Sequence, residues 1–302
     1  MKYGTIPHLD KPISKIVCGT DFLLGQPEET SFAAYDLFWE LGGRAFDSAH
    51  CYGDNSRVFG KWVASRGVAK EVVFLDKGCH PYASKRVTYK DMGDDIRENH
   101  ERLGVEYTDL FVLHRDDPEV PVSEIVDWLN AYKEDGLIGA FGGSNWHHTR
   151  IAAANDYAAK AAKQGFSLNN PNLTLAQNSE PLWGGCLTID REGRRWHESM
   201  QFPLFSWSSM ARGYFAGTTD NDVVRAYDNE ISRARRTRAA ELGAARGVSA
   251  MTIAMAWVLN QPFPVFALAG LRTTEQVKDT LKALDVVLSS AELKWLEDGD
   301  PG

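Results

Sequence analysis

The segment DLFVLHRDDPEVPVSEIVDWLNAYKEDGLIGAFGG, residues 109–143, contains one complete unit of the predicted fold. An apolar run at 109–114 predicts a β-strand, and apolar residues at helical spacing over 123–135 predict a helix. A second apolar run at 138–143 predicts another strand. Two strands joined by a helical crossover of this length run parallel to each other. The segment is therefore a βαβ unit.

The same alternation extends in both directions along the chain. Further strands are predicted at 15–20, 44–49, 72–77, 173–178, 203–208 and 265–270. Helices are predicted at 28–41, 55–66, 88–103, 147–163, 190–200, 227–259 in two pieces, and 274–284. Eight such repeats without a long linker favour a single (β/α)8 TIM barrel, of the α/β class, over residues 1–302.

A doubly wound open sheet is the alternative architecture. For nucleotide binding, that fold should carry GxGxxG after an early strand, or the P-loop pattern GxxxxGK[ST]. Neither motif occurs in the chain. Gly139, Gly142 and Gly143 fall inside a predicted strand, so they do not resemble a phosphate-binding turn.

Composition narrows the functional classes. The chain has 302 residues, of which 43% are hydrophobic, and a formal net charge of −8, which disfavours binding to nucleic acid or to an anionic membrane surface. The four cysteines form no CxxC pair, and the N-terminus lacks the apolar run of a signal peptide. The longest apolar stretch, 250–259, is far shorter than the roughly 20 residues that span a bilayer. We therefore expect a cytoplasmic protein with no transmembrane segment.

Ionisable residues gather where the predicted strands end. Asp47 ends the second strand and is followed by Tyr52, Lys77 ends the third, and His114 ends the fourth. Taken singly, Asp47 could cap a helix and the others could be packed core residues. Together they indicate an active site, because TIM barrels build their sites at the carboxyl ends of the strands. Asp47 and Lys77 can pair, and we expect the ammonium group to lower the pKa of Tyr52 below its usual value of about 10.

These segments resemble the aldo-keto reductase family. FDSAHCYG at 46–53, LDK at 75–77 and LHRDD at 113–117 match the family motifs that carry its catalytic residues. The resemblance implies that Tyr52 donates a proton to a carbonyl oxygen while Lys77 and Asp47 hold and tune it. His114 would orient the substrate. The expected reaction is the NAD(P)H-dependent reduction of an aldehyde or a ketone.

The resemblance also implies a set of cofactor contacts. Ser144, Asn145 and Gln177 would hydrogen-bond the nicotinamide carboxamide, and Trp207, which begins WSSMARG, would stack on the nicotinamide ring. The segment 269–277 resembles the element that holds the adenosine phosphate, although Thr280 stands where an adenine-contacting Asn is usual. Because Arg272 could pair with a 2′-phosphate, NADPH is expected, with NADH as the alternative. The other expected contacts are Asp47, Ser208, Met210, Arg212, Gly270 and Gln276.

The substrate is expected to be a small-molecule carbonyl compound, and the sequence does not indicate an oligomeric state. Besides Tyr52 and His114, the candidate pocket walls are Phe22, Trp146 and Trp183. Acceptors at Asp116, Asp117 and Asn178 would suit a sugar aldehyde or keto-sugar, and a broad-specificity aldehyde reductase is the alternative. No metal site is expected, since His147 and His148 are adjacent at a predicted helix start and point in different directions. Cys51 and Cys79 are interpreted as small packing residues.

A function of another class is also open. Barrels of this kind include the cytoplasmic β-subunits of potassium channels, so the chain could instead be a cofactor-binding, redox-sensing regulatory subunit with little turnover.

Overall fold

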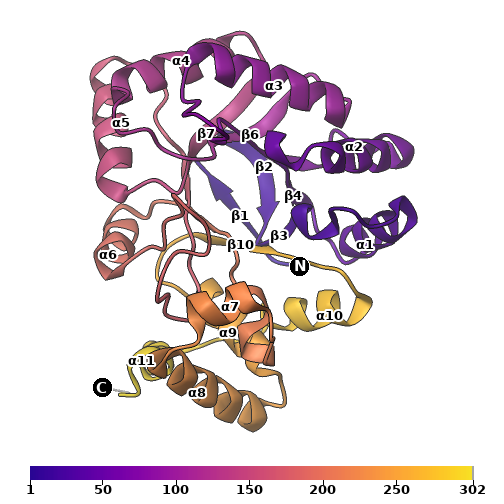
Figure 1. The fold of residues 1–302 in the computed structure, drawn as a ribbon, viewed down its shortest axis with the longest axis vertical. Coiled ribbons are helices and arrows are strands. Elements are labelled where there is room, and N and C mark those ends of the chain that lie inside the picture. Colours follow the sequence, from indigo (N-terminus) through magenta and orange to yellow (C-terminus); the bar gives the residue numbers. More distant parts are fainter. Residues whose placement is uncertain (301–302) are drawn as a thin grey trace.

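Eight parallel strands close into a barrel, and helices surround it on the outside (Figure 1). The computed structural model describes residues 1–300. The predicted (β/α)8 architecture is thereby confirmed. In barrel order the strands are β10 (Val265–Ala269), β3 (Ile16–Gly19), β4 (Ala45–Asp47), β5 (Val73–Gly78), β6 (Thr108–Leu113), β7 (Ile138–Ser144), β8 (Leu168–Asn170) and β9 (Leu204–Ser206).

The helices follow the predicted order, with additions near the C-terminus. Helices α7 and α11 were not predicted, and short 3₁₀ turns follow β3, β4 and β9. The α-helices are α1 (Glu28–Glu40), α2 (Asp54–Arg66), α3 (Tyr89–Leu103), α4 (Val122–Glu134), α5 (His148–Lys160), α6 (Arg191–Met200), α7 (Asn221–Tyr227), α8 (Glu230–Arg246), α9 (Ala250–Leu259), α10 (Thr274–Lys282) and α11 (Ser290–Asp298). The 3₁₀ turns are η1 (Asp21–Leu23), η2 (His50–Tyr52) and η3 (Ala211–Ala216).

Strand alternation places polar residues at one end of the barrel interior. Side chains on a strand point alternately to its two faces, so residues two apart share a face. On β5, Val73 and Leu75 belong to the apolar cluster inside the barrel, and Lys77 is the next residue on that face. Ala45 precedes Asp47 in the same way on β4. The carboxyl ends of these strands therefore present charged groups above an apolar floor.

Glycine allows β7 and β8 to approach each other closely. A Cβ atom added at Gly142 would lie 2.1 Å from the backbone oxygen of Leu168 on β8. No side chain fits at that separation. Gly142 therefore allows β7 and β8 to pair closely enough for the barrel to close.

The sixth strand was predicted in the wrong place. The structure puts it at β8, Leu168–Asn170, and not at 173–178. β8 has only three residues, of which two are asparagines with weak β-propensity, so its sequence signal is poor. The alternating segment after it bonds to α8: Arg235 Nη1 donates to Leu175 O at 2.9 Å, and Gln177 N donates to Ser232 Oγ at 2.9 Å.

An N-terminal hairpin that was not predicted covers the amino end of the barrel. It consists of β1 (Tyr3–Ile6) and β2 (Leu9–Ser14), which pair antiparallel. Ile6 and Ile13 pack into the interior apolar cluster. Lys11 pairs with Asp109 at 2.9 Å, and His8 Nδ1 lies 3.0 Å from Ser167 Oγ. These contacts fix the hairpin against the starts of β6 and β8.

Within residues 1–300, no single helix is long and apolar enough to cross a membrane. Helices α8 and α9 meet that length and composition only when taken together, and they are bent by 100° relative to each other.

Asp76 is a buried carboxyl that points away from the barrel interior. Its Oδ1 accepts hydrogen bonds from Lys77 N at 2.8 Å and from Asn99 Nδ2 at 2.5 Å, whereas its buried Oδ2 has no partner. Burial raises the pKa of Asp76 to about 7. The folded protein therefore retains this proton at pH values where the unfolded chain has lost it.

We predict that Asp76→Asn removes a pH-dependent loss of stability. Because the folded pKa is raised, the wild-type stability from this group is complete below about pH 4 and is lost as the pH rises to about 7. The roughly three-unit difference corresponds to at most about 4 kcal/mol. Urea unfolding across this range should show the variant gaining stability relative to the wild type as the pH rises. The exposed control Asp10→Asn should follow the wild-type profile. A constant difference between Asp76→Asn and the wild type at every pH would contradict the prediction.

Candidate active site

A buried ion pair forms the centre of the site. Lys77 Nζ contacts Asp47 Oδ1, and the two side chains are only 3% and 4% exposed. The other carboxylate oxygen, Oδ2, accepts a hydrogen bond of 3.5 Å from the Tyr52 hydroxyl. The ring of His114 lies edge-on to Tyr52, with 6.4 Å between the ring centres. The structure therefore brings together the four residues predicted to be catalytic.

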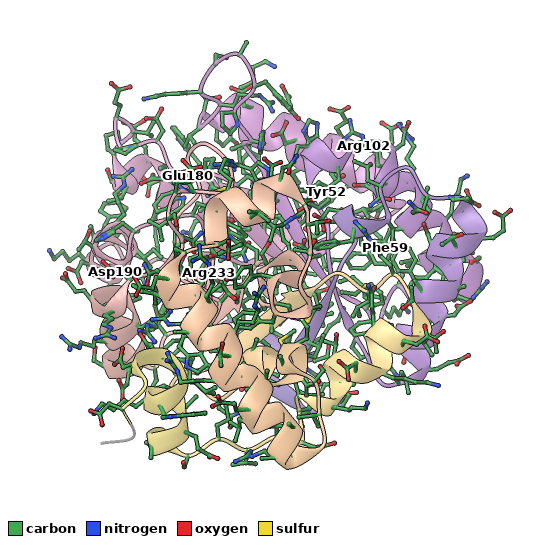
Figure 2. The ribbon with its side chains drawn as sticks, turned by 60° about the horizontal axis from the view of Figure 1, so that its bottom comes forward. Tyr52, Phe59, Arg102, Glu180, Asp190 and Arg233 are labelled. Carbon is green, nitrogen blue, oxygen red and sulfur yellow. The ribbon has the colours of Figure 1, made fainter. Side chains whose placement is uncertain are left out.

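A short turn after β4 positions Tyr52. Residues 50–52 form η2, and Gly53 adopts a positive φ of 58° that sends the chain directly into α2. This φ favours glycine because a Cβ atom is strained there. Arg102 of α3, labelled beside Tyr52 in Figure 2, donates to His50 O at 2.7 Å. The turn is therefore fixed by the Arg102 hydrogen bond at its start and by the entry of the chain into α2 at its end.

The expected lowering of the Tyr52 pKa is wrong. Burial, followed by the carboxylates of Asp47 and Asp21, raises the pKa of Tyr52 well above its ordinary value. The sequence-based expectation for this pKa failed for two reasons. The charge of Lys77 is already paired with Asp47, and the carboxylate of Asp21 was not anticipated at the site. Tyr52 is therefore a neutral phenol with an O–H available for donation near neutral pH.

Burial also controls the other titratable groups. It lowers the pKa of His114 well below the usual value, and Lys77 and Arg115 add to this effect. His114 is therefore a neutral imidazole. Burial raises the pKa of Asp47, while the adjacent Lys77 acts in the opposite direction. It also raises the pKa of Asp21 to about 6.

The four residues line a small pocket of about 80 Å³ that joins a larger groove of about 720 Å³. Phe22, Ser208 and Leu268 line both spaces. The groove extends from these three shared residues to α10, so one of its ends lies at the tetrad pocket.

One side of the pocket is formed by Ser144 at the end of β7, by Asn145 directly after it, and by Trp207. Asn145 has a left-handed φ of 62°. Its Oδ1 accepts from Trp207 Nε1 at 3.1 Å, and its Nδ2 donates to His114 O at 3.2 Å. Ser144 Oγ donates to Asn170 O at 3.0 Å. Ser144, Asn145 and Trp207 therefore lie where the sequence predicted.

Gln177 does not belong to this group. It lines a separate cavity of about 710 Å³ together with Arg194 and Glu297. This follows from the misplaced strand, since the polar residue at the end of β8 is Asn170, which lines the tetrad pocket. The spacing of Leu168 and Asn170, two residues apart like Leu75 and Lys77, was the signal that could have identified it.

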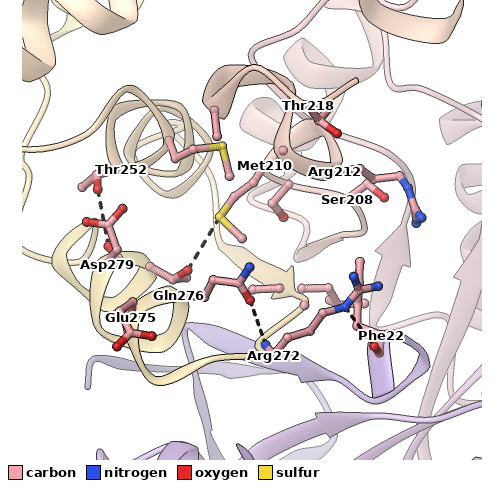
Figure 3. A pocket seen from close by; sticks show the side chains of 18 of the residues that line it. Phe22, Ser208, Met210, Arg212, Thr218, Thr252, Arg272, Glu275, Gln276 and Asp279 are labelled. Carbon is pink, nitrogen blue, oxygen red and sulfur yellow. Dashed lines mark hydrogen bonds between the residues drawn. The ribbon is translucent and has the colours of Figure 1, made fainter. Parts of the chain in front are cut away.

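The larger groove contains the residues predicted to contact the rest of the cofactor (Figure 3). Arg272 donates through Nε to Phe22 O at 3.0 Å and through its backbone N to Gln276 Oε1 at 3.0 Å. Thr280 Oγ1 lies 3.7 Å from Met210 Sδ. The predicted residues that line this groove are Phe22, Ser208, Met210, Arg212, Gly270, Arg272, Gln276 and Thr280.

The chemistry of the groove fits a phosphate-bearing dinucleotide. The guanidinium groups of Arg212 and Arg272 both lie near the Phe22 ring, at 5.5 and 5.6 Å from its centre. Helix α10 begins at Thr274, directly after Arg272 and the capping residue Thr273, and helix N-termini favour anions. Two cations and a helix N-terminus in one groove are suited to bind phosphate groups.

The substrate side departs from the sequence predictions. Phe22 and Trp183 line the tetrad pocket, but Trp146 is fully buried and packs on Phe166 with 5.0 Å between ring centres. Asp116 is paired with Arg150 at 2.9 Å, and Asp117 with Lys85 at 2.8 Å. Asn178 lines the separate cavity with Gln177. The three acceptors proposed for sugar hydroxyls are therefore not at the pocket.

Other pocket residues were not anticipated. They include Asp21 and Asn170, discussed above, and also Arg115 and Cys186. Arg115 Nη2 donates to Cys186 Sγ at 3.1 Å, and its buried Nε has no partner. Arg115 directly follows His114, which was the available signal. Cys186 lies three residues after Trp183, a predicted pocket wall, and that proximity was the available signal.

Comparisons with known proteins identify the family. The sequence model of the aldo/keto reductase family matches residues 15–298, so the chain belongs to that family and is an oxidoreductase of carbonyl compounds. Its barrel also matches the crystal structure of the thermostable aldo-keto reductase Tm1743, with a TM-score of 0.76, 19% identity and full coverage of both chains.

Among curated relatives, the norsolorinic acid reductase stcV of Emericella nidulans is 26% identical over 91% of this chain and 73% of its own. The uncharacterized oxidoreductase YrpG of Bacillus subtilis is 25% identical over 100% of this chain and 97% of its own. The NADP(+) aryl-alcohol dehydrogenase of Phanerodontia chrysosporium is 24% identical over 91% of this chain and 77% of its own. These identities support an oxidoreductase that acts on carbonyl compounds.

Proposed function

We propose that this protein is an NADPH-dependent reductase of small aromatic aldehydes or ketones, with Tyr52 as the proton donor. The observation that carries the proposal is the buried Lys77–Asp47 pair beside the Tyr52 hydroxyl, in a pocket that opens into the cofactor-sized groove. Because the desolvation of a buried ion pair can exceed the Coulombic attraction between its charges, such a pair contributes little to stability and favours a functional role.

Each tetrad residue has a distinct role in the proposal. Tyr52 donates its proton to the oxygen on which negative charge develops as the carbonyl is reduced. Asp47 accepts from the Tyr52 hydroxyl and holds the Lys77 ammonium in place. The charge of Lys77 stabilises the phenolate that remains after proton transfer. Neutral His114 hydrogen-bonds the carbonyl oxygen and orients the substrate.

A reduced nicotinamide dinucleotide supplies the hydride when it is bound. The residues suited to hold its nicotinamide end are Ser144, Asn145 and Trp207, and we assign to Asn170 the amide contact that was expected of Gln177. Arg272 and the start of α10 are suited to hold its adenosine phosphate.

An aromatic substrate suits the walls of the pocket. Phe22 and Trp183 face it, and Trp183 lies 5.9 Å from Trp207 between ring centres. Aromatic rings pack favourably against such walls. Asp116 and Asp117 are engaged in ion pairs elsewhere, so the basis for a sugar substrate is removed. The similarity to a protein named aryl-alcohol dehydrogenase supports this choice.

Substrate preference gives the first test of the proposed function. Loss of NADPH absorbance with the purified protein should give a kcat/KM for benzaldehyde-type substrates at least about tenfold above that for aldoses. Burial of an aromatic ring contributes about 2 kcal/mol, which is of this order. Equal or higher kcat/KM for aldoses would contradict the aromatic proposal. Cofactor binding without consumption across the whole panel would favour the regulatory alternative.

We predict that Tyr52→Phe lowers kcat by about 10²-fold or more, since general acid catalysis contributes this amount. The cofactor dissociation constant should change little, because the hydroxyl faces Asp47 within the tetrad pocket. Steady-state kinetics and fluorescence titration measure the two effects separately. Tyr89→Phe, an exposed tyrosine on α3, is the matched control and should keep its activity. Normal turnover by Tyr52→Phe would exclude this residue as the proton donor.

Cofactor preference gives a third test. Arg272→Gln should weaken NADPH binding by about ten- to a hundredfold, because a charge-assisted hydrogen bond contributes about 1.5–3 kcal/mol. NADH binding should change much less, since NADH lacks the 2′-phosphate. Lys278→Gln removes the same charge from the same groove and serves as the control. Equal losses for both cofactors, or an equal effect of both variants, would contradict the assignment of Arg272.

A further inference from the structure

Cys51, His80 and His114 form a cluster beside the tetrad. One potential metal-ligating atom from each residue lies within 4.8 Å of the corresponding atoms of the other two. Cys51 Sγ lies 3.6 Å from His114 Nδ1, and the rings of His80 and His114 lie 4.7 Å apart between centres. His80 Nδ1 is buried and has no hydrogen-bond partner. The cluster therefore contains a thiol and two imidazoles, and one imidazole nitrogen, His80 Nδ1, has no hydrogen-bond partner.

A strained turn places His80 in this cluster. The preceding residue, Cys79, is buried and has a left-handed φ of 60°, which is unfavourable for a residue with a side chain. Its backbone N donates to Asp95 Oδ2 at 2.7 Å. This bond to a buried carboxylate holds the chain in the strained conformation as it leaves β5, and so fixes the position of His80 over His114.

We propose that Cys51, His80 and His114 form a binding site for a thiophilic cation such as Zn²⁺. Tetrahedral zinc, with bonds of about 2.3 Å to sulfur and about 2.0–2.1 Å to nitrogen, requires a sulfur–nitrogen separation of about 3.6 Å. Cys51 Sγ and His114 Nδ1 already have this separation. His80 is partly exposed, so a small rotation of its side chain can complete the set. Water would fill the fourth position.

Metal binding releases one proton. The cation replaces the thiol proton of Cys51, which passes to the buffer, and the two imidazoles bind through neutral nitrogens. Burial raises the pKa of Cys51 to about 11, so the thiol is protonated before the cation enters. No electron transfer is involved. A coordinate bond at Nδ1 of His114 leaves its other ring nitrogen as an N–H donor.

Nearby charges limit the affinity without abolishing it. Lys77 and Arg115 are the cations that act on Cys51 and His114, and they disfavour a dication. Lys77 is paired with Asp47, which offsets much of its charge. Arg115 and Arg86 act on His80 as cations, and Asp95 acts in the opposite direction. The thiolate formed on binding adds a further negative charge to the cluster.

Calorimetric titration of the reduced, chelator-treated protein with ZnCl₂ tests the proposal directly. In two buffers of different ionisation enthalpy, it should give one high-affinity site and about one proton released per Zn²⁺. Co²⁺ should produce the intense visible and thiolate charge-transfer absorption of a tetrahedral site. Cys51→Ser and His80→Gln should each weaken Zn²⁺ binding by at least about tenfold. Because binding itself is measured, failure here is distinguishable from failure of the proposed reductase activity.

Two controls separate this site from other thiols and histidines. Cys186→Ser removes another thiol near the tetrad, and His147→Gln disrupts a pair of adjacent histidine rings outside it. Both should leave Zn²⁺ affinity within about twofold of the wild type. Thermal melts without metal verify that each variant is folded. The proposal is overturned if Cys51→Ser and His80→Gln bind Zn²⁺ as tightly as the wild type, or if binding is lost with Cys186 or His147 instead.

Discussion

The contact between Lys77 and Asp47 is the constraint on which the functional end of the barrel depends. Both groups are almost wholly buried, and each satisfies the charge of the other. In the parallel pairing of β4 with β5, Asp47 is opposite Leu75, so Lys77 lies two residues further along β5 on the same face. Its long side chain reaches back to the Asp47 carboxylate. Removal of either partner would leave an uncompensated buried charge, at a typical cost of about 3–5 kcal/mol. Tyr52 depends on the same pair, because its hydroxyl bonds to the carboxylate that Lys77 holds.

Much of this end of the barrel was predictable because the signal is local. Ionisable residues at the ends of apolar strands identified Asp47, Lys77 and His114 as active-site candidates, and the structure places them above the interior apolar cluster. The prediction failed where the strand is shortest: β8 has three residues, and the more regular segment after it was chosen instead. Gln177 was misassigned for that reason, and Asn170 was missed.

Other features could not be predicted, because they depend on residues that are distant in sequence. The raised pKa of Tyr52 reflects burial, then the carboxylate of Asp47, and then that of Asp21, which enters the site from the turn after β3. The contact between Arg115 and Cys186, which lies in the loop of the predicted pocket wall Trp183, is likewise a tertiary feature. The Cys51, His80 and His114 cluster matches no metal-binding spacing, since each residue follows a different strand. Only closure of the barrel brings them together.

The N-terminal hairpin limits the contact of the barrel interior with solvent. Ile6 and Ile13 close the amino end with apolar side chains, and Lys11 and His8 tie the hairpin to the strand starts. The amino end of the barrel is therefore closed, and the tetrad pocket and the groove lie at the opposite, carboxyl ends of the strands. A molecule bound in the groove lies against the walls that the groove shares with the tetrad pocket, so it also restricts the exchange of water and protons between bulk solvent and the buried Lys77 and Asp47.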